Sequence, residues 1–194
     1  MSDLIIGLGH RSGMGKDAVG DYLVKMYGFE RVAFADALKD VARDLSPFLA
    51  NTIVAGVGDI ETAKNTDPRI RNLLITLGNS MREHVSREVW VASVVEKIKS
   101  TTRPVVVTDV RFAEEVKAIH GLGGYLVKVT RPQVAIRENV SDSALACYTG
   151  WDMEIQNNEG LPALYRTVDQ VLNRLYRDKR LDEVKRQPDH ELSL

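Results

Sequence analysis

The sequence has a single cysteine, Cys147, and no long apolar run among its 194 residues. One cysteine excludes an internal disulfide and is typical of a reducing compartment. No apolar stretch approaches the roughly 18 residues that a membrane-spanning helix needs. The amino terminus also lacks a basic region followed by a long apolar core. We therefore expect a cytoplasmic protein without a membrane partner.

An excess of charge of either sign is also missing. The chain has 26 Lys and Arg residues against 27 Asp and Glu residues, a formal net charge of -1. This balance argues against nonspecific nucleic-acid binding, so we expect no nucleic-acid partner. Internal repeats and low-complexity tracts are absent as well. The length suits one domain, large enough for a sheet covered on both faces.

The most informative stretch that is present is the glycine-rich segment from Gly7 to Asp17. It follows a short apolar run at 4–6 and precedes a segment with helical periodicity, so the predicted order is strand, loop, helix. Phosphate-binding loops have this order because backbone N–H groups of the loop and the first helical turn point at one anion. The helix dipole adds positive potential there, and Lys16 would reach the terminal phosphates of a nucleotide.

This loop departs from the consensus G-x-x-x-x-G-K-[ST] at two positions. His10 stands at the first glycine position and Asp17 at the Ser/Thr position. The hydroxyl of that Ser or Thr normally helps to hold magnesium. A carboxylate at position 17 would bind the metal directly or through water, or it would cap the helix. A glycine-rich turn without any ligand is the alternative interpretation of the whole stretch.

Two helices are predicted between this loop and the middle of the chain. A second strand at 32–34 is followed by a helix from 35 to about 45, in which Asp36 is an N-cap or a ligand contact. The region from 47 to 68 lacks periodicity and is typical of a lid or binding flap. The next helix begins at Pro68 and carries Arg71 and Arg82 on one side, roughly 16 Å apart. Scattered solvated charges on an exposed helix are the alternative for these two arginines.

The clearest strand spans 104–109 and ends in a carboxylate, Asp109. Continuous apolar strands are buried on both faces, as in parallel sheets. Asp109 is then a magnesium-side carboxylate or the N-cap of the next helix. Further strands are predicted at 125–130, ending beside Arg131, and at 153–157, before a closing helix at 161–175. This order predicts a three-layer α/β fold with a mostly parallel five-stranded sheet flanked by helices.

Six short pieces of the chain, at 11–17, 34–40, 71–78, 90–91, 107–115 and 127–132, carry a family resemblance through their order and spacing. Together they resemble the phage-type deoxynucleoside monophosphate kinases, a branch of the P-loop nucleotide kinases. Loops of that family tend to end in Gly-Lys-Asp, which makes Asp17 a family trait. The family's Ser-Gly-Lys-Asp is lengthened here to Ser-Gly-Met-Gly-Lys-Asp.

The resemblance implies a P-loop kinase fold and transfer of the ATP γ-phosphoryl group to a deoxynucleoside 5′-monophosphate. ATP and Mg²⁺ are the implied cofactors, and the location becomes the host cytoplasm if a phage encodes the protein. We expect one kinase domain at 1–178 with an acceptor-binding excursion at about 47–88, a lid-like segment at about 133–149 and a flexible tail at 179–194. A homodimer is expected if Trp90 and Trp151 are exposed.

The resemblance also implies roles for single residues, which fall into three groups. Those on the ATP phosphates are Gly13, Met14, Gly15, Lys16 and Asp17. Those on the acceptor are Lys39, Arg71 and Arg82 at its phosphate, with Asp36 and Arg111 positioning it. Those with a catalytic role are Lys16, Arg11, Asp109 and Arg131, while Asp17 and Asp109 are the magnesium-side carboxylates.

Two other functions stay open at this point. One is a P-loop kinase of another small phosphorylated metabolite, such as dephospho-coenzyme A or phosphomevalonate, which would need a different acceptor pocket at 36–82. The other is a nucleotide-binding regulator without catalysis. The departures from the consensus at His10 and Asp17 support this alternative. The number of arginines argues against the regulator, because binding alone seldom needs several guanidinium groups at one phosphate cluster.

Overall fold

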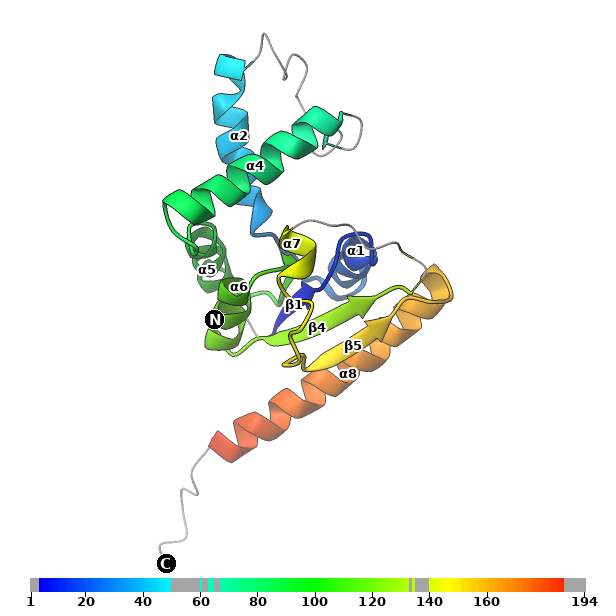
Figure 1. Cartoon of the computed structure of the whole chain (residues 1–194). Helices are drawn as coiled ribbons and strands as arrows, with labels where there is room; N and C mark the ends of the chain where they lie inside the picture. The colour runs from blue at the N-terminus through cyan, green and yellow to red at the C-terminus, as the bar shows by residue number, and fades with distance from the viewer. Residues whose placement is uncertain are drawn as a thin grey trace, which may run out of the picture.

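The centre of the fold is a five-stranded sheet in which every neighbouring pair is parallel (Figure 1). A computed structural model describes residues 4–49, 60, 63–64, 67–132, 134 and 140–186. The strands are β1 (Ile5–Gly9), β2 (Glu30–Val32), β3 (Val105–Val110), β4 (Tyr125–Thr130) and β5 (Met153–Gln156). Their order is β2-β3-β1-β4-β5. The predicted mostly parallel sheet is thus confirmed, with the second strand slightly earlier than expected.

This strand order creates a crevice at the carboxyl end of β1. The chain leaves β1 toward β3 and β2 on one side, whereas β4 and β5 lie on the other side. In open α/β sheets, ligands bind where the strand order reverses in this way. The glycine-rich segment that follows β1 therefore lies at the place where a ligand site is expected.

Helices cover both faces of the sheet and complete three layers. On one face, α1 (Lys16–Tyr27) and α8 (Leu161–Arg186) pack against the sheet through a cluster that includes Val19, Leu23 and Leu172. On the other face, α5 (Val91–Ser100) and α6 (Ala113–Gly121) bury their apolar sides. Trp90 is 6% exposed and belongs to this second cluster, as expected for a core residue.

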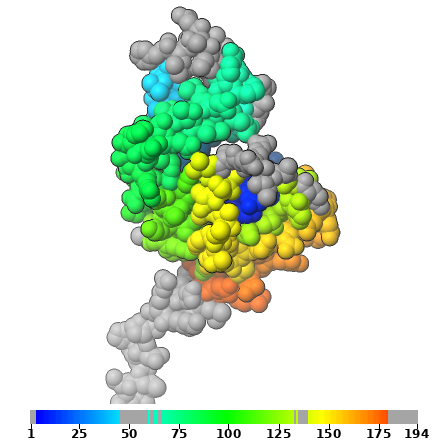
Figure 2. All heavy atoms as spheres, viewed as in Figure 1, coloured from blue at the N-terminus to red at the C-terminus, as the bar shows by residue number. Residues whose placement is uncertain are grey.

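Two further helices form an arm that projects from the sheet (Figure 1, Figure 2). These are α2 (Ala35–Leu49) and α4 (Pro68–His84). They share a small separate cluster of Ala42, Ile60, Ile70 and Leu74. The start of α4 agrees with the prediction: Pro68 occupies the first turn and the Asp67 carboxylate accepts a hydrogen bond from the Arg69 N–H. Most of the predicted excursion between 47 and 68 lies outside the described residues.

The carboxyl-terminal part differs from the sequence-based expectation. Of the predicted lid segment, residues 133 and 135–139 lie outside the described part, and the remainder contains the short helix α7 (Val140–Ser143). Helix α8 continues to Arg186, beyond the boundary predicted at 178. The added residues are mainly Lys, Arg, Leu and Glu, which favour helix even without an apolar stripe. None of the helices described is long and apolar enough to cross a membrane.

Candidate active site

The segment between β1 and α1 turns through three residues in the left-handed region. Gly13 has φ 78° and Gly15 has φ 100°, as glycine readily allows. His10 has φ 92° and is the sole described residue other than glycine with positive φ. His10 stands at the first glycine position of the consensus, so it adopts the backbone conformation that glycine would favour there. Histidine is among the residues that tolerate this conformation best.

Lys16, the first residue of α1, is buried beneath this loop. Its side chain donates hydrogen bonds to the His10 carbonyl at 3.3 Å and to the Arg11 carbonyl. The residue is 6% exposed, and burial followed by the nearby Arg111 charge lowers the pKa of Lys16 to about 8. The loop therefore holds its cation by its own backbone carbonyls, and contact of Lys16 with phosphate stays a prediction.

Asn157 supports the loop from the end of β5, and sequence reasoning did not identify it. Its Nδ2 donates to the Met14 carbonyl at 3.1 Å. A Cβ atom on Gly15 would lie 2.5 Å from the same nitrogen, so only glycine fits at that position. The Met14 side chain is itself buried in the core. The one available signal for Asn157 was its place as the last residue of the last predicted strand.

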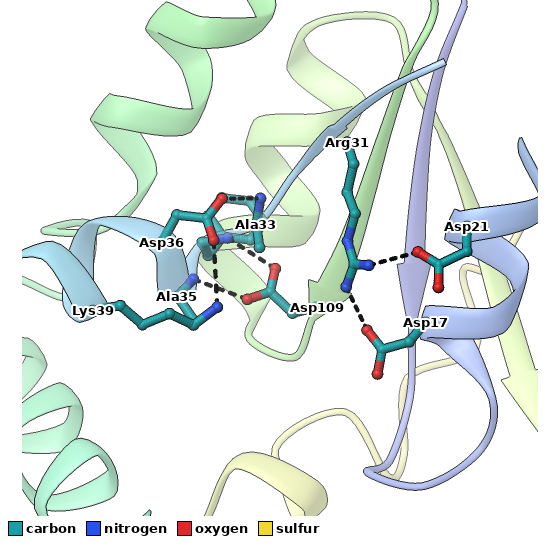
Figure 3. Close-up of polar contacts among 9 residues, drawn as sticks. Asp17, Asp21, Arg31, Ala33, Ala35, Asp36, Lys39 and Asp109 are labelled. Carbon is teal, nitrogen blue, oxygen red and sulfur yellow. Dashed lines mark hydrogen bonds and ion pairs between the residues drawn. The ribbon is translucent and has the colours of Figure 1, made fainter. Parts of the chain in front are cut away.

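Asp109 and Asp36 meet at the start of the arm (Figure 3). The two oxygens of Asp109 accept hydrogen bonds from the backbone N–H groups of Phe34 (2.8 Å) and Ala35 (2.9 Å). Asp109 thus caps the beginning of α2 rather than the following helix, and burial raises its pKa. Asp36 accepts from the Ala33 N–H at 3.0 Å and pairs with Lys39 at 3.4 Å. The predicted acceptor-side residues Asp36 and Lys39 are therefore adjacent.

Asp17, predicted as a magnesium-side carboxylate, pairs with an arginine in the structure. Asp17 is 80% exposed at its side chain and pairs with Arg31 Nη2 at 2.6 Å, while Arg31 Nη1 pairs with Asp21 at 2.8 Å (Figure 3). In the described ranges, no cluster of three or more His, Cys, Asp or Glu side chains could enclose a metal. Magnesium commonly uses one or two carboxylates together with waters and substrate phosphates. In this structure Asp17 is paired with Arg31 and both Asp109 oxygens accept backbone N–H groups, so the magnesium-side roles of the two carboxylates stay predictions.

Arg111 follows β3 and is held by the short helix α7. Its Nη1 donates to Asp142 Oδ1 at 3.0 Å and to Ser141 Oγ at 3.1 Å. The same Asp142 oxygen accepts the backbone N–H of Ser12, in the loop, at 3.0 Å. Asp142 lies in the polar segment that the sequence suggested as a lid, but no pattern there singled it out.

Arg82 is placed differently from the other predicted acceptor residues. Its guanidinium pairs with Glu114 at 3.1 Å and Glu115 at 3.8 Å, and it lies 3.6 Å from the centre of the Phe112 ring. The side chain is 11% exposed, so these contacts fasten the end of α4 to α6. Burial and the Asp109 charge raise the pKa of Glu115 to about 8. The assignment of Arg82 to the acceptor phosphate stays a prediction.

Of the other predicted cations, Arg71 lies partly buried on α4 of the arm. Arg131 is exposed directly after β4, and Arg11 is partly buried within the loop, where its Nε is buried without a hydrogen-bond partner among the described residues. The structure thus brings Lys16, Asp109, Arg111 and Asp142 into one electrostatic neighbourhood.

Residues 44–168, more than half of the chain, match the model of the family "Deoxynucleotide monophosphate kinase". The chain belongs to this family. Across 184 residues it is 27% identical to a protein of Acanthamoeba polyphaga mimivirus named "Putative deoxynucleotide monophosphate kinase", covering 85% of this chain and 94% of that protein. It is 30% identical over 167 residues to "Uncharacterized protein ORF77" of Ictalurid herpesvirus 1, covering 84% of this chain and 60% of that protein.

Solved structures support the same fold for this member of the deoxynucleotide monophosphate kinase family. A gluconokinase from Sinorhizobium meliloti superposes with a TM-score of 0.51 at 17% identity, covering 92% of this chain and 97% of that chain. A shikimate kinase from Acinetobacter baumannii gives a TM-score of 0.50 at 14% identity, covering 92% and 96%. The predicted P-loop kinase fold is confirmed. Family and fold together support a nucleotide-using phosphotransferase that acts on a small molecule.

Proposed function

We propose that this protein transfers the γ-phosphoryl group of ATP to the 5′-phosphate of a deoxynucleoside monophosphate, giving the diphosphate. The observation that carries this proposal is the glycine-rich loop with its buried Lys16, placed at the strand-order reversal of a chain whose family is deoxynucleotide monophosphate kinase. The arm of α2 and α4 projects from the sheet (Figure 1), and we assign the acceptor to it.

On the donor side, the loop would bind the ATP phosphates through backbone N–H groups around Gly13 and Gly15. Lys16 would exchange its carbonyl partners for phosphate oxygens, because its hydrogen bonds to charged oxygens are stronger than those to neutral carbonyls. Arg11 and Arg131 would add positive charge around the transferring group. Magnesium, when bound, neutralises charge on the β- and γ-phosphates, and Asp17 and Asp109 would hold its coordinating waters.

On the acceptor side, Lys39 and Arg71 would bind the monophosphate, with Asp36 and Arg111 positioning the nucleotide. Arg82 keeps its predicted place in this set, although its ion pairs with α6 would have to rearrange for that contact. Phosphoryl transfer asks the protein mainly to orient two phosphates in line and to stabilise charge. A cationic edge opposite a backbone-lined loop suits that task.

The direct experiment incubates the full-length protein with ATP, magnesium and each of the four common deoxynucleoside monophosphates, and separates the products by chromatography. We expect at least one diphosphate to form, and no diphosphate with Lys16→Ala. Running the matching ribonucleotides beside them tests the preference for the deoxy sugar. ATP binding without turnover of any monophosphate would overturn the proposed reaction.

A further inference from the structure

We propose that Asp142 is a positioning residue that fixes the guanidinium of Arg111 against the phosphate-binding loop and aims its remaining nitrogens at substrate phosphate. This inference rests on the proposed function and adds to it a residue from the segment after β4. Asp142 would act through Arg111 and would not itself contact the phosphates.

The first observation is the burial and bonding of the carboxylate. The Asp142 side chain is 1% exposed, and one of its oxygens accepts hydrogen bonds from both Ser12 N and Arg111 Nη1, each at 3.0 Å. These partners are 130 and 31 residues away in the sequence. A carboxylate is costly to bury unless it is paired and hydrogen-bonded. The pairing therefore joins three segments: the loop, the β3–α6 turn and α7.

The space-filling view shows the same junction. The segment around α7, in yellow, lies directly against the blue amino-terminal part of the chain that includes the loop (Figure 2). Helix α7 is only four residues long. Its tie to Ser12 and Arg111 thus holds α7 itself over the loop, in addition to holding Arg111.

The second observation is that, among the described residues, only one nitrogen of the Arg111 guanidinium donates hydrogen bonds. Nη1 is shared between Asp142 and Ser141, whereas Nη2 and Nε make no hydrogen bond to any described residue. A guanidinium held at one nitrogen keeps a pair of donors in fixed geometry, which matches two oxygens of a phosphate. Arg111 is also close enough to Lys16 to lower the lysine pKa, so both cations address one place.

A carboxylate beside a phosphate site can also act as a competitor, which occupies the hydrogen-bond donors of the site until the phosphate displaces it. Two features favour positioning. Asp142 is buried rather than exposed in the crevice, and its neighbour Ser141 holds the same Arg111 nitrogen from the same helix. Displacement would cost this buried carboxylate its hydrogen bonds from Ser12 and Arg111, and lost hydrogen bonds of a buried charged group carry a large penalty.

The experiment is a double-mutant cycle with Arg111→Ala, Asp142→Ala and the combined variant, measured in the full-length protein. Calorimetry with ATP alone and with the accepted monophosphate alone gives the two affinities, and steady-state rates give kcat and KM. The affinity that falls in Arg111→Ala shows whether Arg111 binds ATP or the monophosphate. We expect Asp142→Ala to weaken binding of the same nucleotide and to lower kcat/KM by about 10- to 100-fold. When Arg111 is already alanine, the Asp142→Ala change should lower the nucleotide affinity and kcat/KM by less than about twofold.

The matched control is Asp169→Ala on α8. Asp169 also uses one oxygen for two donors, the hydroxyls of Tyr22 and Tyr27, but it joins α1 to α8 outside the site. We expect this change to leave both affinities and kcat/KM within about twofold of wild type. If Asp142→Ala does not fold, Asp142→Asn carries the cycle, because its amide oxygen can still accept both hydrogen bonds while the charge is lost. We then expect a smaller loss of the same kind.

Two results would overturn the inference. Tighter nucleotide binding in Asp142→Ala would make the carboxylate a competitor of phosphate. A full additional loss in the Arg111→Ala background would show that Asp142 does not act through Arg111. The binding measurements need no turnover, so they remain informative if no deoxynucleotide is phosphorylated, and that failure would count against the proposed reaction alone.

Discussion

The phosphate-binding loop and the arm of α2 and α4 hold their charged groups in different ways. In the loop, glycines in the left-handed region form the turn, and backbone carbonyls of the same loop bind Lys16. On the arm, Asp36 with Lys39 and Arg82 with Glu114 and Glu115 form ion pairs between side chains. The loop is therefore shaped by backbone geometry, whereas the charges of the arm depend on which side chains are paired.

The two regions also differ in how they are anchored. The loop lies between β1 and α1, whose apolar residues belong to the large cluster under α8. The arm has its own small cluster and meets the main body through Asp109 at the start of α2 and Arg82 near the end of α4. A change in the loop should thus act on binding and catalysis, and a change at the root of the arm should act on stability.

The largest expected effect is at the loop. Lys16→Ala should lower kcat by about 100- to 1,000-fold, because a preorganised donor at developing charge contributes that much. The free energy of unfolding should change little, because the loss of the hydrogen bonds to two loop carbonyls offsets the removal of a buried charge. Product separation and urea denaturation measure the two quantities. A variant that keeps most of its activity would show that the loop is not the phosphate site.

The second effect tests the root of the arm. Arg82→Ala should destabilise the protein by about 2 kcal/mol, because the partly buried Glu114 loses its cation. Glu115, whose pKa is about 8, keeps its hydrogen bonds from two backbone N–H groups. Arg71→Ala, on the same helix, should instead raise the acceptor KM with little change in stability. Denaturation and steady-state kinetics on both variants separate these outcomes. Unchanged stability together with a raised acceptor KM in Arg82→Ala would place Arg82 on the acceptor phosphate, as the sequence predicts.

The third effect compares two left-handed glycines. Gly15→Ala forces a Cβ to 2.5 Å from the Asn157 amide, whereas Gly28→Ala, at φ 69°, meets nothing within 4 Å. Both changes should cost about 1–2 kcal/mol of stability through the backbone conformation, and Gly15→Ala should cost more because its Cβ also clashes with Asn157. Only Gly15→Ala should weaken ATP binding, which calorimetry can measure. Equal ATP affinity in the two variants would contradict the role assigned to the close contact at Gly15.

The smallest effect is the pH dependence of nucleotide binding. Because burial lowers the pKa of Lys16 to about 8 in the free protein, its charge is present below that pH and is lost as the pH rises above it. ATP affinity should be steady below pH 8 and fall by up to about tenfold per pH unit above it. Lys16→Arg should abolish this fall, since a guanidinium does not titrate in that range. A fall of the same size in Lys16→Arg would assign the titration to another group.

Sequence-based reasoning was most accurate where the signal is local. The continuous apolar run before Asp109 predicted a buried parallel strand, and β3 spans Val105–Val110. Pro68 predicted the start of α4. The glycine-rich segment after a short apolar run predicted the order of strand, loop and helix that β1 and α1 form. It was less accurate at the end of α8, where helix propensity without an apolar stripe gave no visible pattern.

Partners that lie far apart in the sequence could not be predicted in this way. Asp142 and Ser12 are separated by 130 residues, Asn157 and Met14 by 143, and Arg82 and Glu114 by 32. Nothing local tells a carboxylate that caps a helix from one that binds a metal or holds an arginine. Asp109 illustrates this, since it was interpreted as a metal-side group or an N-cap of the next helix and in fact caps α2.

The sequence by itself determined that this chain forms a parallel α/β domain with a glycine-rich loop after its first strand. Periodicity, strand-end residues and glycine positions are properties of neighbouring residues, so they can be read along the chain. The tertiary structure decided which charges meet: Lys16 with loop carbonyls, Arg111 with Asp142, and Arg82 with the glutamates of α6. Those pairings depend on how the sheet brings distant segments together, because a charge in a low-dielectric interior is stabilised only by the groups that actually surround it.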